Sequence, residues 1–174
     1  LVMPPRCVRM PTAACIPWTS SGLVSTRTRM TLRPLTRCSS ASSAVNTISP
    51  EVGKELSTLV DELSAAAEVK AVVVASGKKE GFIAGAHIDT FQALTTAADA
   101  EALARELQGV YGRLEKLGKP VVAAIHGTAL GGGFELCLAC HHRVAAENDK
   151  TRLGLPEVKI GLFPGAGGTQ RIAR

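Results

Sequence analysis

The hydrophobic pattern divides the chain at about residue 45. Residues 1–44 show neither the two-residue period of a strand nor the 3.6-residue period of a helix, whereas the rest alternates apolar runs with amphipathic segments. The run 71–76 is continuously apolar, which predicts a strand buried on both faces. The run 121–125 has the same character and predicts a second strand. Shorter extended pieces are expected at 82–88, 143–146 and 152–155.

Two segments between these runs carry the period of an amphipathic helix. The first begins with Ser49 and Pro50, a pair typical of the N-cap and the first helical position. The second begins after Thr95 or Thr96, and its apolar residues recur at spacings of four and three until Gly118 ends it. Because strands alternate with helices, the sequence predicts an α/β fold with parallel pairing, and it has no internal repeat that would indicate a solenoid.

Three consecutive glycines, Gly131, Gly132 and Gly133, separate the strand at 121–125 from a helix expected at 134–140. Glycine allows another group to approach the backbone closely. Tight packing between strand and helix is one explanation of the triplet. A ligand that lies against the backbone is the other.

Glu135 directly follows this triplet and is the only charged side chain between Lys119 and Arg143. On a helix its neighbours three and four positions later are Leu138 and Ala139, so its carboxylate faces an apolar surface. Such a carboxylate must be paired, hydrogen-bonded or shifted in pKa. A catalytic acid or base is one interpretation; an acid that suits the helix dipole is the other.

A second acid in an unusual place is Glu157, which lies between Pro156 and the apolar Val158. Two carboxylates presented from separate elements into apolar surroundings can divide the work of general acid and general base, because each raises the pKa of the other. The alternative is that Glu157 only begins a helix whose first residue is Pro156.

Charge is distributed unevenly along the chain. Residues 1–44 contain six arginines and no acid, whereas residues 45–174 carry 14 basic against 15 acidic side chains, so the net charge of +5 belongs to the first segment. The body therefore lacks the basic surface typical of nucleic-acid-binding proteins. The Arg- and Ser-rich segment resembles a mitochondrial transit peptide, although its prolines disfavour one amphipathic helix; a fragmentary gene model is the alternative. We expect little ordered structure in it.

The remaining motifs indicate no cofactor. The spacing of Cys137, Cys140 and His141 matches haem attachment, but it lies in an apolar helical run, and a zinc site would need a second Cys/His pair. We expect both cysteines to be core residues, His126 to be structural, and no metal to bind. The Lys-Ser/Thr of a phosphate loop and the elbow of a serine hydrolase are both absent. No apolar run approaches the roughly 18 residues of a membrane span.

Three linked motifs carry a resemblance to a known family. They read FIAGA at 82–86, HGTALGGGFEL at 126–136 and LPEVKIGLFPGAGGTQR at 155–171. In this order and spacing they resemble the crotonase, or enoyl-CoA hydratase/isomerase, superfamily, and most of all the hydratase modules of multifunctional fatty-acid oxidation α subunits. The resemblance covers residues 45–174 and implies a spiral of ββα turns, incomplete at both ends.

The resemblance also implies roles for named residues. The backbone N–H groups of Ala86 and Gly132 would hold the thioester oxygen of an acyl-CoA substrate, while Glu135 and Glu157 would hold a water between them. In hydration, one glutamate activates that water for attack at C3 of a trans-2-enoyl-CoA, and the other, usually Glu157, delivers a proton to C2. The expected substrate-binding backbone comprises Ala84, Gly85 and Gly131. No cofactor is expected, since the CoA thioester is the substrate.

The chain departs from the family pattern in three places. His87 stands where the family usually has an aspartate, and neither the family's first hairpin before Val45 nor its C-terminal helices beyond Arg174 has a counterpart. These departures favour one alternative, a non-catalytic acyl-CoA-binding fragment. A second alternative within the family is an isomerase, which needs only a proton relay between C2 and C4, so the presence of both glutamates favours the hydratase. The resemblance further implies an oligomer, or a complex with a thiolase β subunit. The location would be the cytoplasm in a bacterium, or the mitochondrion if residues 1–44 are a transit peptide.

Overall fold

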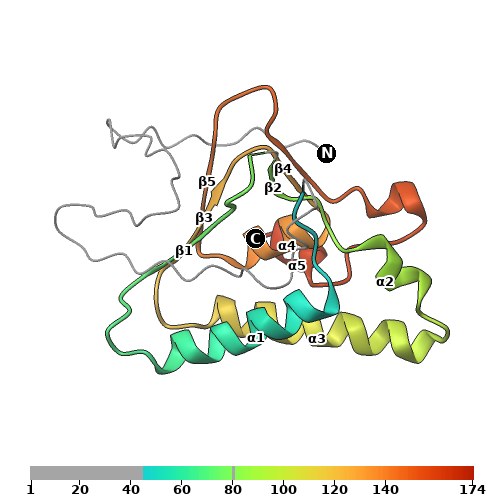
Figure 1. Cartoon of the computed structure of the whole chain (residues 1–174), viewed down its shortest axis with the longest axis horizontal. Helices are drawn as coiled ribbons and strands as arrows, with labels where there is room; N and C mark the ends of the chain where they lie inside the picture. The colour runs from blue at the N-terminus through green and yellow to red at the C-terminus, as the bar shows by residue number, and fades with distance from the viewer. Residues whose placement is uncertain (1–44, 80) are drawn as a thin grey trace.

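A computed structural model describes residues 45–79 and 81–174 of the chain (Figure 1). The expectations for residues 1–44 lie outside the described residues. The first helix, α1 (Pro50–Ala65), begins as predicted: Ser49 is its N-cap, and the hydroxyl of Ser49 accepts a hydrogen bond from the N–H of Val52 at 3.4 Å. The bond satisfies one of the free N–H groups in the first turn.

The strands form two parallel three-stranded sheets. The first sheet has the order β1 (Val72–Ala75), β3 (Val121–Ile125), β5 (His142–Ala145). The second has the order β2 (Gly81–Ile83), β4 (Thr128–Leu130), β6 (Arg152–Gly154). Each pass of the chain therefore adds one strand to each sheet and then continues into a helix, so the fold is α/β and built from ββα turns.

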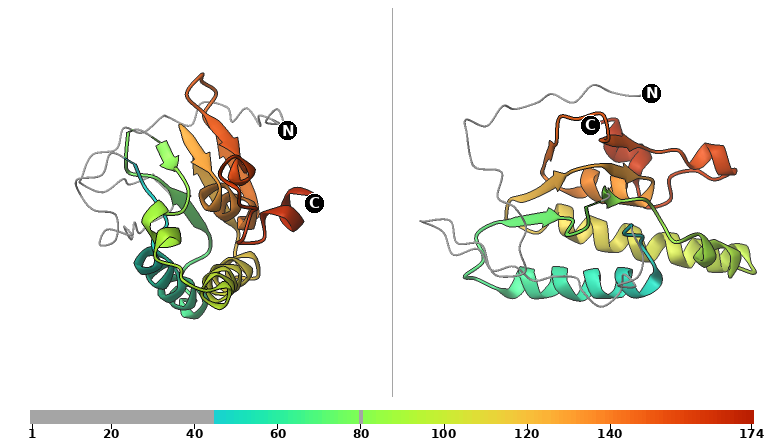
Figure 2. Two further views of the ribbon diagram at one scale, coloured as in Figure 1. Left: turned by 90° about the vertical axis from the view of Figure 1, so that its right-hand side faces the viewer. Right: turned by 45° about the horizontal axis from the view of Figure 1, so that its top comes forward.

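The remaining helices follow these strand pairs. They are α2 (Ile88–Gln92), α3 (Ala97–Glu115), α4 (Gly132–Ala139), the 3₁₀ helix η1 (Glu157–Ile160) and α5 (Gly168–Ile172). Thr96 caps α3 through a capping box with Asp99, and Gly118, with φ of 71°, follows its end. The two long helices α1 and α3 lie side by side and form one layer, while α4 lies between this layer and the strands of the second sheet, and α5 packs beside α4 (Figures 1 and 2).

Three details of the sequence prediction are wrong. β1 is not buried on both faces: Val72 and Val74 pack against the core, whereas Val73 is 49% exposed, because successive side chains point to opposite faces of the sheet and only one face of β1 meets the core. The helix expected at 134–140 begins at Gly132. Strand β4 and helix α2 were not predicted, since both are too short to show a period.

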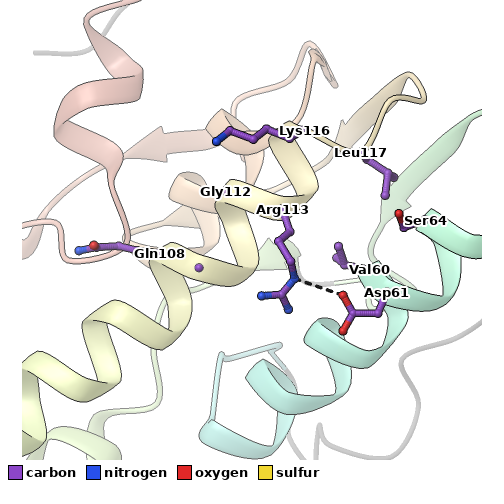
Figure 3. Close-up of a pocket in the computed structure, with 9 residues that line it drawn as sticks. Val60, Asp61, Ser64, Gln108, Gly112, Arg113, Lys116 and Leu117 are labelled. Atoms are coloured by element: carbon purple, nitrogen blue, oxygen red, sulfur yellow. Dashed lines mark ion pairs between the residues drawn. The ribbon is translucent and has the colours of Figure 1, made fainter.

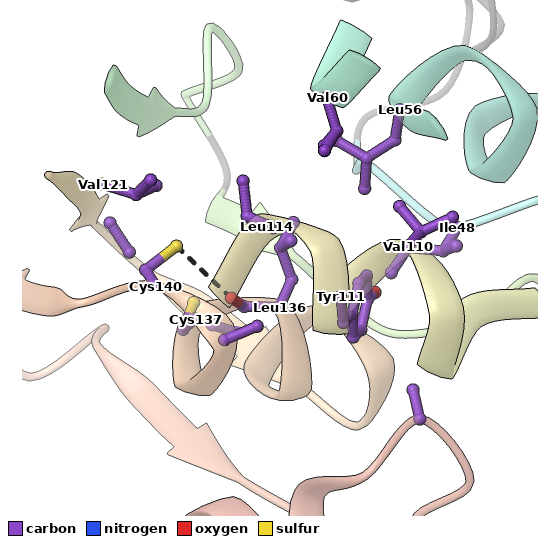
Figure 4. Packing of buried hydrophobic residues seen from close by; sticks show 14 of the residues in the cluster. Ile48, Leu56, Val60, Val110, Tyr111, Leu114, Val121, Leu136, Cys137 and Cys140 are labelled. Atoms are coloured by element: carbon purple, nitrogen blue, oxygen red, sulfur yellow. Dashed lines mark hydrogen bonds between the residues drawn. The ribbon is translucent and has the colours of Figure 1, made fainter. Parts of the chain in front are cut away.

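The core lies where α1, α3 and α4 meet the first sheet (Figure 4). Tyr111 and Leu114 of α3 are fully buried beside Leu136 and Cys137 of α4. Cys137 and Cys140 are core residues, as predicted, and burial raises the pKa of the Cys140 thiol to about 12. A thiol that stays protonated at neutral pH is a poor nucleophile and a poor metal ligand.

His126 is also structural, as predicted, because its Nε2 lies 2.8 Å from the carbonyl oxygen of Lys78. A cleft separates α1 from α3 at the surface, and Asp61 and Arg113 form an ion pair across it at 3.2 Å (Figure 3). This cleft contains none of the candidate site residues. Every helix in the described part of the chain is too short or too polar to span a membrane.

Candidate active site

Glu135 lies in the first turn of α4 and is the one buried charged residue among those described, at 2% exposed. Its Oε1 accepts two backbone hydrogen bonds, from the N–H of Ala166 at 2.9 Å and from the N–H of Gly168 at 2.8 Å. Its Oε2 accepts no bond from any described residue. The side chain is therefore fixed through one oxygen, and the other oxygen remains available.

Burial raises the pKa of Glu135 above its ordinary value. The hydrogen bonds from Gly168 and Ala166 oppose this effect because they favour the charged form, while the charge of Glu157 adds to it. The expectation that this carboxylate must be hydrogen-bonded or shifted in pKa is thus met in both ways. A carboxyl group with a raised pKa can exchange protons nearer to neutral pH than an exposed one.

The loop that holds Glu135 requires glycine. A Cβ atom on Gly168 would lie 2.8 Å from Cγ of Glu135 and 2.9 Å from its Oε1, which is closer than such contacts permit. The absence of a side chain at position 168 therefore lets the backbone N–H come within hydrogen-bonding distance of the carboxylate.

Glu157 opens the helix η1, with Pro156 immediately before it. Its Oε1 lies 3.1 Å from the position that a Cβ on Gly131 would occupy, so the carboxyl group lies against the glycine triplet. Its Oε2 is buried and has no hydrogen-bond partner among the described residues. A buried carboxylate oxygen without a partner is rare in proteins and often belongs to a functional site.

The backbone of Gly132 lies close to Glu135 and Ala86. A Cβ on Gly132 would lie 3.9 Å from Oε2 of Glu135 and 4.0 Å from the nitrogen of Ala86. Gly132 is the first residue of α4, so its N–H has no partner within the helix. Within residues 45–79 and 81–174, neither this N–H nor that of Ala86 donates a hydrogen bond.

Flanking hydrogen bonds hold Ala86 in place. Ile48 donates to the carbonyl of Gly85 and accepts from the N–H of His87, both at 2.9 Å, so the peptide on each side of Ala86 is tied to the same residue. His87 itself is half-exposed and lies 3.7 Å from Asp89. The histidine that departs from the family pattern thus leaves the backbone at Ala86 anchored.

The structure brings the sequence-predicted residues together. We refer to Ala86, Gly131, Gly132, Glu135 and Glu157 as the glutamate site. A Cβ on Gly131 would lie 3.9 Å from Cα of Gly85, so these two expected substrate-binding residues border the site. Ala84, the third, lies next along the chain and donates its N–H to the carbonyl of Asn46 at 2.9 Å.

Sequence reasoning missed three residues that support this site. Tyr111 is fully buried and donates its hydroxyl to the carbonyl of Gly132 at 2.9 Å. Arg171 and Gln108 bond to carbonyl groups of the loop that holds Glu135. Tyr111 offered a signal, because it is the one tyrosine of the chain and carries a polar hydroxyl on the apolar face of its helix. Among the described residues there is no group of three or more His, Cys, Asp or Glu side chains that suits a metal ion.

Comparisons with known proteins agree with this geometry. A family model described as enoyl-CoA hydratase/isomerase matches residues 40–174. The chain is 50% identical over 130 residues to a fatty acid oxidation complex subunit alpha of Shewanella oneidensis, and 51% identical to the corresponding subunit of Shewanella loihica. These matches cover 75% of this chain and 18% of each relative.

Solved structures give the same result. An enoyl-CoA hydratase from Bacillus anthracis is 34% identical with a TM-score of 0.68, and DspI of Pseudomonas aeruginosa is 34% identical with a TM-score of 0.69. Each match covers 74% of this chain and 48% of the solved chain. The fold, the motifs and the family match lead to one conclusion: the chain belongs to the enoyl-CoA hydratase/isomerase family.

Proposed function

We propose that the glutamate site hydrates trans-2-enoyl-CoA thioesters to 3-hydroxyacyl-CoA. The observation that carries the proposal is the pair of carboxyl groups at the glycine triplet. Glu135 and Glu157 come from separate elements, and each has an oxygen without a hydrogen-bond partner among the described residues. Glu135 lies beside Gly132, whose N–H donates to no described residue, and Glu157 lies against the neighbouring Gly131. Hydration needs this combination, because a water must be activated at one carbon while charge builds on a nearby oxygen.

In the proposed reaction, Glu135 and Glu157 hold one water molecule through their free oxygens. One glutamate removes a proton from the water while the water oxygen bonds to C3. The electron pair of the C2–C3 double bond then moves toward the thioester carbonyl. Glu157 then delivers a proton to C2. The product gains one hydroxyl group and one hydrogen, so the elements of water are balanced and no redox partner is required.

The N–H groups of Ala86 and Gly132 would stabilise the thioester oxygen as it becomes negatively charged. Gly132 is suited to this role because it begins α4, where the helix dipole also favours negative charge. Loss of one donor of this kind typically costs about 3–4 kcal/mol of transition-state stabilisation. Tyr111 supports the arrangement by fixing the carbonyl of Gly132.

The relatives suggest a wider setting. They are named as α subunits of a fatty acid oxidation complex, of which this chain spans 18%. We therefore propose that the chain acts in fatty-acid oxidation as part of a multifunctional enzyme, in an oligomer or together with a thiolase β subunit. The relatives are bacterial, so of the two expected locations we propose the cytoplasm.

The test is the loss of the conjugated enoyl-thioester absorbance of crotonyl-CoA. Hydration predicts that absorbance falls and that 3-hydroxybutyryl-CoA forms. An isomerase would instead convert a 3-enoyl-CoA and tolerate the loss of one glutamate. A binding fragment would take up acyl-CoA in calorimetry without converting it, and this last outcome would overturn the proposal.

A further inference from the structure

The loop 165–168 binds the carboxylate of Glu135 through two backbone N–H groups. The carbonyl groups of the same loop accept hydrogen bonds from residues of α3 and α5. Gln108 of α3 donates its Nε2 to the carbonyl of Gly165 at 2.7 Å. Arg171 of α5 donates its Nη1 to the carbonyl of Ala166 at 2.8 Å. The backbone N–H of Arg171 donates to the carbonyl of Gly167 at 3.2 Å. The three consecutive carbonyl groups of residues 165–167 thus all accept hydrogen bonds.

Two of these three contacts fall on the peptide groups that bind Glu135, and the third, from the Arg171 side chain, falls on the peptide between Ala166 and Gly167, which connects those two. The peptide between Gly165 and Ala166 accepts from Gln108 at its oxygen and donates to Glu135 at its nitrogen. The peptide between Gly167 and Gly168 accepts from the N–H of Arg171 and donates to Glu135. A peptide that is hydrogen-bonded at one end is polarised and donates more strongly at the other.

Arg171 is itself fixed and largely buried. Its side chain is 10% exposed, and its Nε pairs with Oε2 of Glu115 at 3.1 Å. The guanidinium group lies against Gly167, where a Cβ would come within 2.5 Å of Nη1. Gly167 also has φ of 95°, so both its backbone and the arginine beside it favour glycine. By contrast, Arg174 pairs with the same glutamate at 3.2 Å but is 73% exposed.

We propose that Arg171, held by Glu115 and assisted by Gln108, is a positioning residue for Glu135. Arg171 fixes the loop 165–168 so that its amides bind Oε1 of Glu135 and leave Oε2 directed to the reacting water. The inference rests on the proposed function only for its catalytic consequence. The positioning of the carboxylate by the loop is a property of the chain itself.

The charges around Glu135 define what a titration would measure. Glu157 raises the pKa of Glu135, whereas Arg171 and the two loop amides lower it, and Tyr111 of α3 is near enough to experience the charge of Glu135. Loss of the Arg171 side chain removes a positive charge and loosens the amides, and both changes favour the protonated carboxyl group.

The experiment is a carboxyl-carbon NMR titration of the chain labelled with ¹³C-glutamate, in which Glu135→Gln assigns the Glu135 resonance. Arg171→Gln should raise the pKa of Glu135 by roughly half a pH unit or more. The amide protons of Ala166 and Gly168 should move upfield as their bonds to Oε1 lengthen. Arg174→Gln, which removes the exposed partner of Glu115, should leave all of these signals near their original values.

A second variant tests the loop without a change of charge. Gln108→Leu removes the bond to the carbonyl of Gly165, and because Gln108 is exposed the fold should be retained. It should raise the pKa of Glu135 less than Arg171→Gln does and shift the Ala166 amide most. If Arg171→Gln does not fold, the titration of Gln108→Leu tests whether hydrogen bonds to the loop carbonyls position Glu135. Unchanged Glu135 and Ala166 signals in the folded variants would overturn the proposal.

Activity gives an independent second readout. With crotonyl-CoA, Arg171→Gln should lower kcat by roughly ten- to a hundredfold and change KM little, since a displaced carboxylate affects the reaction more than substrate binding. The acid limb of the pH–rate profile should move to higher pH, because the pKa of Glu135 is raised. If the original chain converts no crotonyl-CoA, the proposed function fails, and the titration still decides whether Arg171 positions Glu135.

Discussion

The helix pair α1–α3 and the glutamate site are built in opposite ways. Between the helices, side chains such as Val60 and Val110 fill the interior, and the glycine Gly112 has nothing within 4 Å of its missing Cβ. Directly beside the glutamate site the backbone itself is the packing surface, and a Cβ on Gly133 would lie 2.5 Å from the carbonyl oxygen of Ile83. The difference indicates that the helix pair stabilises the fold, whereas the site depends on close backbone contacts that no other residue type permits.

The largest difference between the two regions should appear in activity. Glu135→Gln or Glu157→Gln should lower hydration of crotonyl-CoA by about 10²–10⁴-fold, because each removes a group that transfers a proton. Glu55→Gln is the matched control: Glu55 lies on α1, is not one of the residues of the glutamate site, and also has a buried carboxyl oxygen without a described partner. Equal losses in all three variants would show that a buried carboxylate matters to folding rather than to the site.

The next largest difference between the two regions should appear in the free energy of unfolding when a glycine is replaced by alanine. Gly133→Ala should destabilise the protein by about 3 kcal/mol, because the added methyl group would overlap a backbone oxygen that cannot move alone. Gly112→Ala should instead stabilise it by about 0.5–1 kcal/mol, since alanine is the better helix former and the space is open. Urea unfolding of both variants measures the contrast, and similar midpoints would contradict it.

Tyr111 is the side chain that joins the regions, and its loss should have a moderate effect. Tyr111→Phe removes the bond to the carbonyl of Gly132 and should cost about 1–1.5 kcal/mol in free energy of unfolding. Thr58→Val on α1 removes an exposed hydroxyl bond to the carbonyl of Lys54 and should change stability by less than about 0.5 kcal/mol. If Tyr111→Phe were as stable as Thr58→Val, the hydrogen bond from Tyr111 of α3 to Gly132 would contribute nothing to stability, which would contradict this prediction.

The smallest effect should be a dependence of stability on pH. The folded chain raises the pKa of Glu135 above the ordinary value of 4.5, so the folded state holds this proton more tightly than the unfolded state. The corresponding stability is complete below the unfolded pKa and is lost as pH rises through the folded pKa. Glu135→Gln should therefore melt up to a few degrees higher than the original chain at pH 7 and converge with it near pH 4. A variant less stable at pH 7 would contradict the sign.

The sequence predicted the elements whose signals are local. The cap at Ser49, the capping residue Thr96 and the strand at 121–125 all follow from residues adjacent in the chain. The short strand β4 was missed because its three residues are too few to show a period, and the exposure of Val73 depends on which face of the sheet packs against the core. Such properties are decided by tertiary pairing and not by local pattern.

The site shows the same limit. Glu135 was conspicuous because it is a charge in an apolar run, and Glu157 because it follows a proline among apolar residues. Arg171, by contrast, looks like an ordinary helical arginine in the sequence. Its role depends on a loop carbonyl five residues earlier and on Glu115, 56 positions away. Long-range partners of this kind cannot be deduced from one sequence without a structure.

The central claim is that Glu135 and Glu157 share one site. The most direct test is a titration of Glu135 with and without the carboxyl group of Glu157. The pKa of Glu135, followed by carboxyl-carbon NMR, should fall when Glu157 is replaced by glutamine, because a neighbouring negative charge is removed. Glu55→Gln should leave it unchanged. A Glu135 titration that is the same in Glu157→Gln as in the original chain would mean that the two carboxyl groups do not face each other, and the proposed hydration would have no basis.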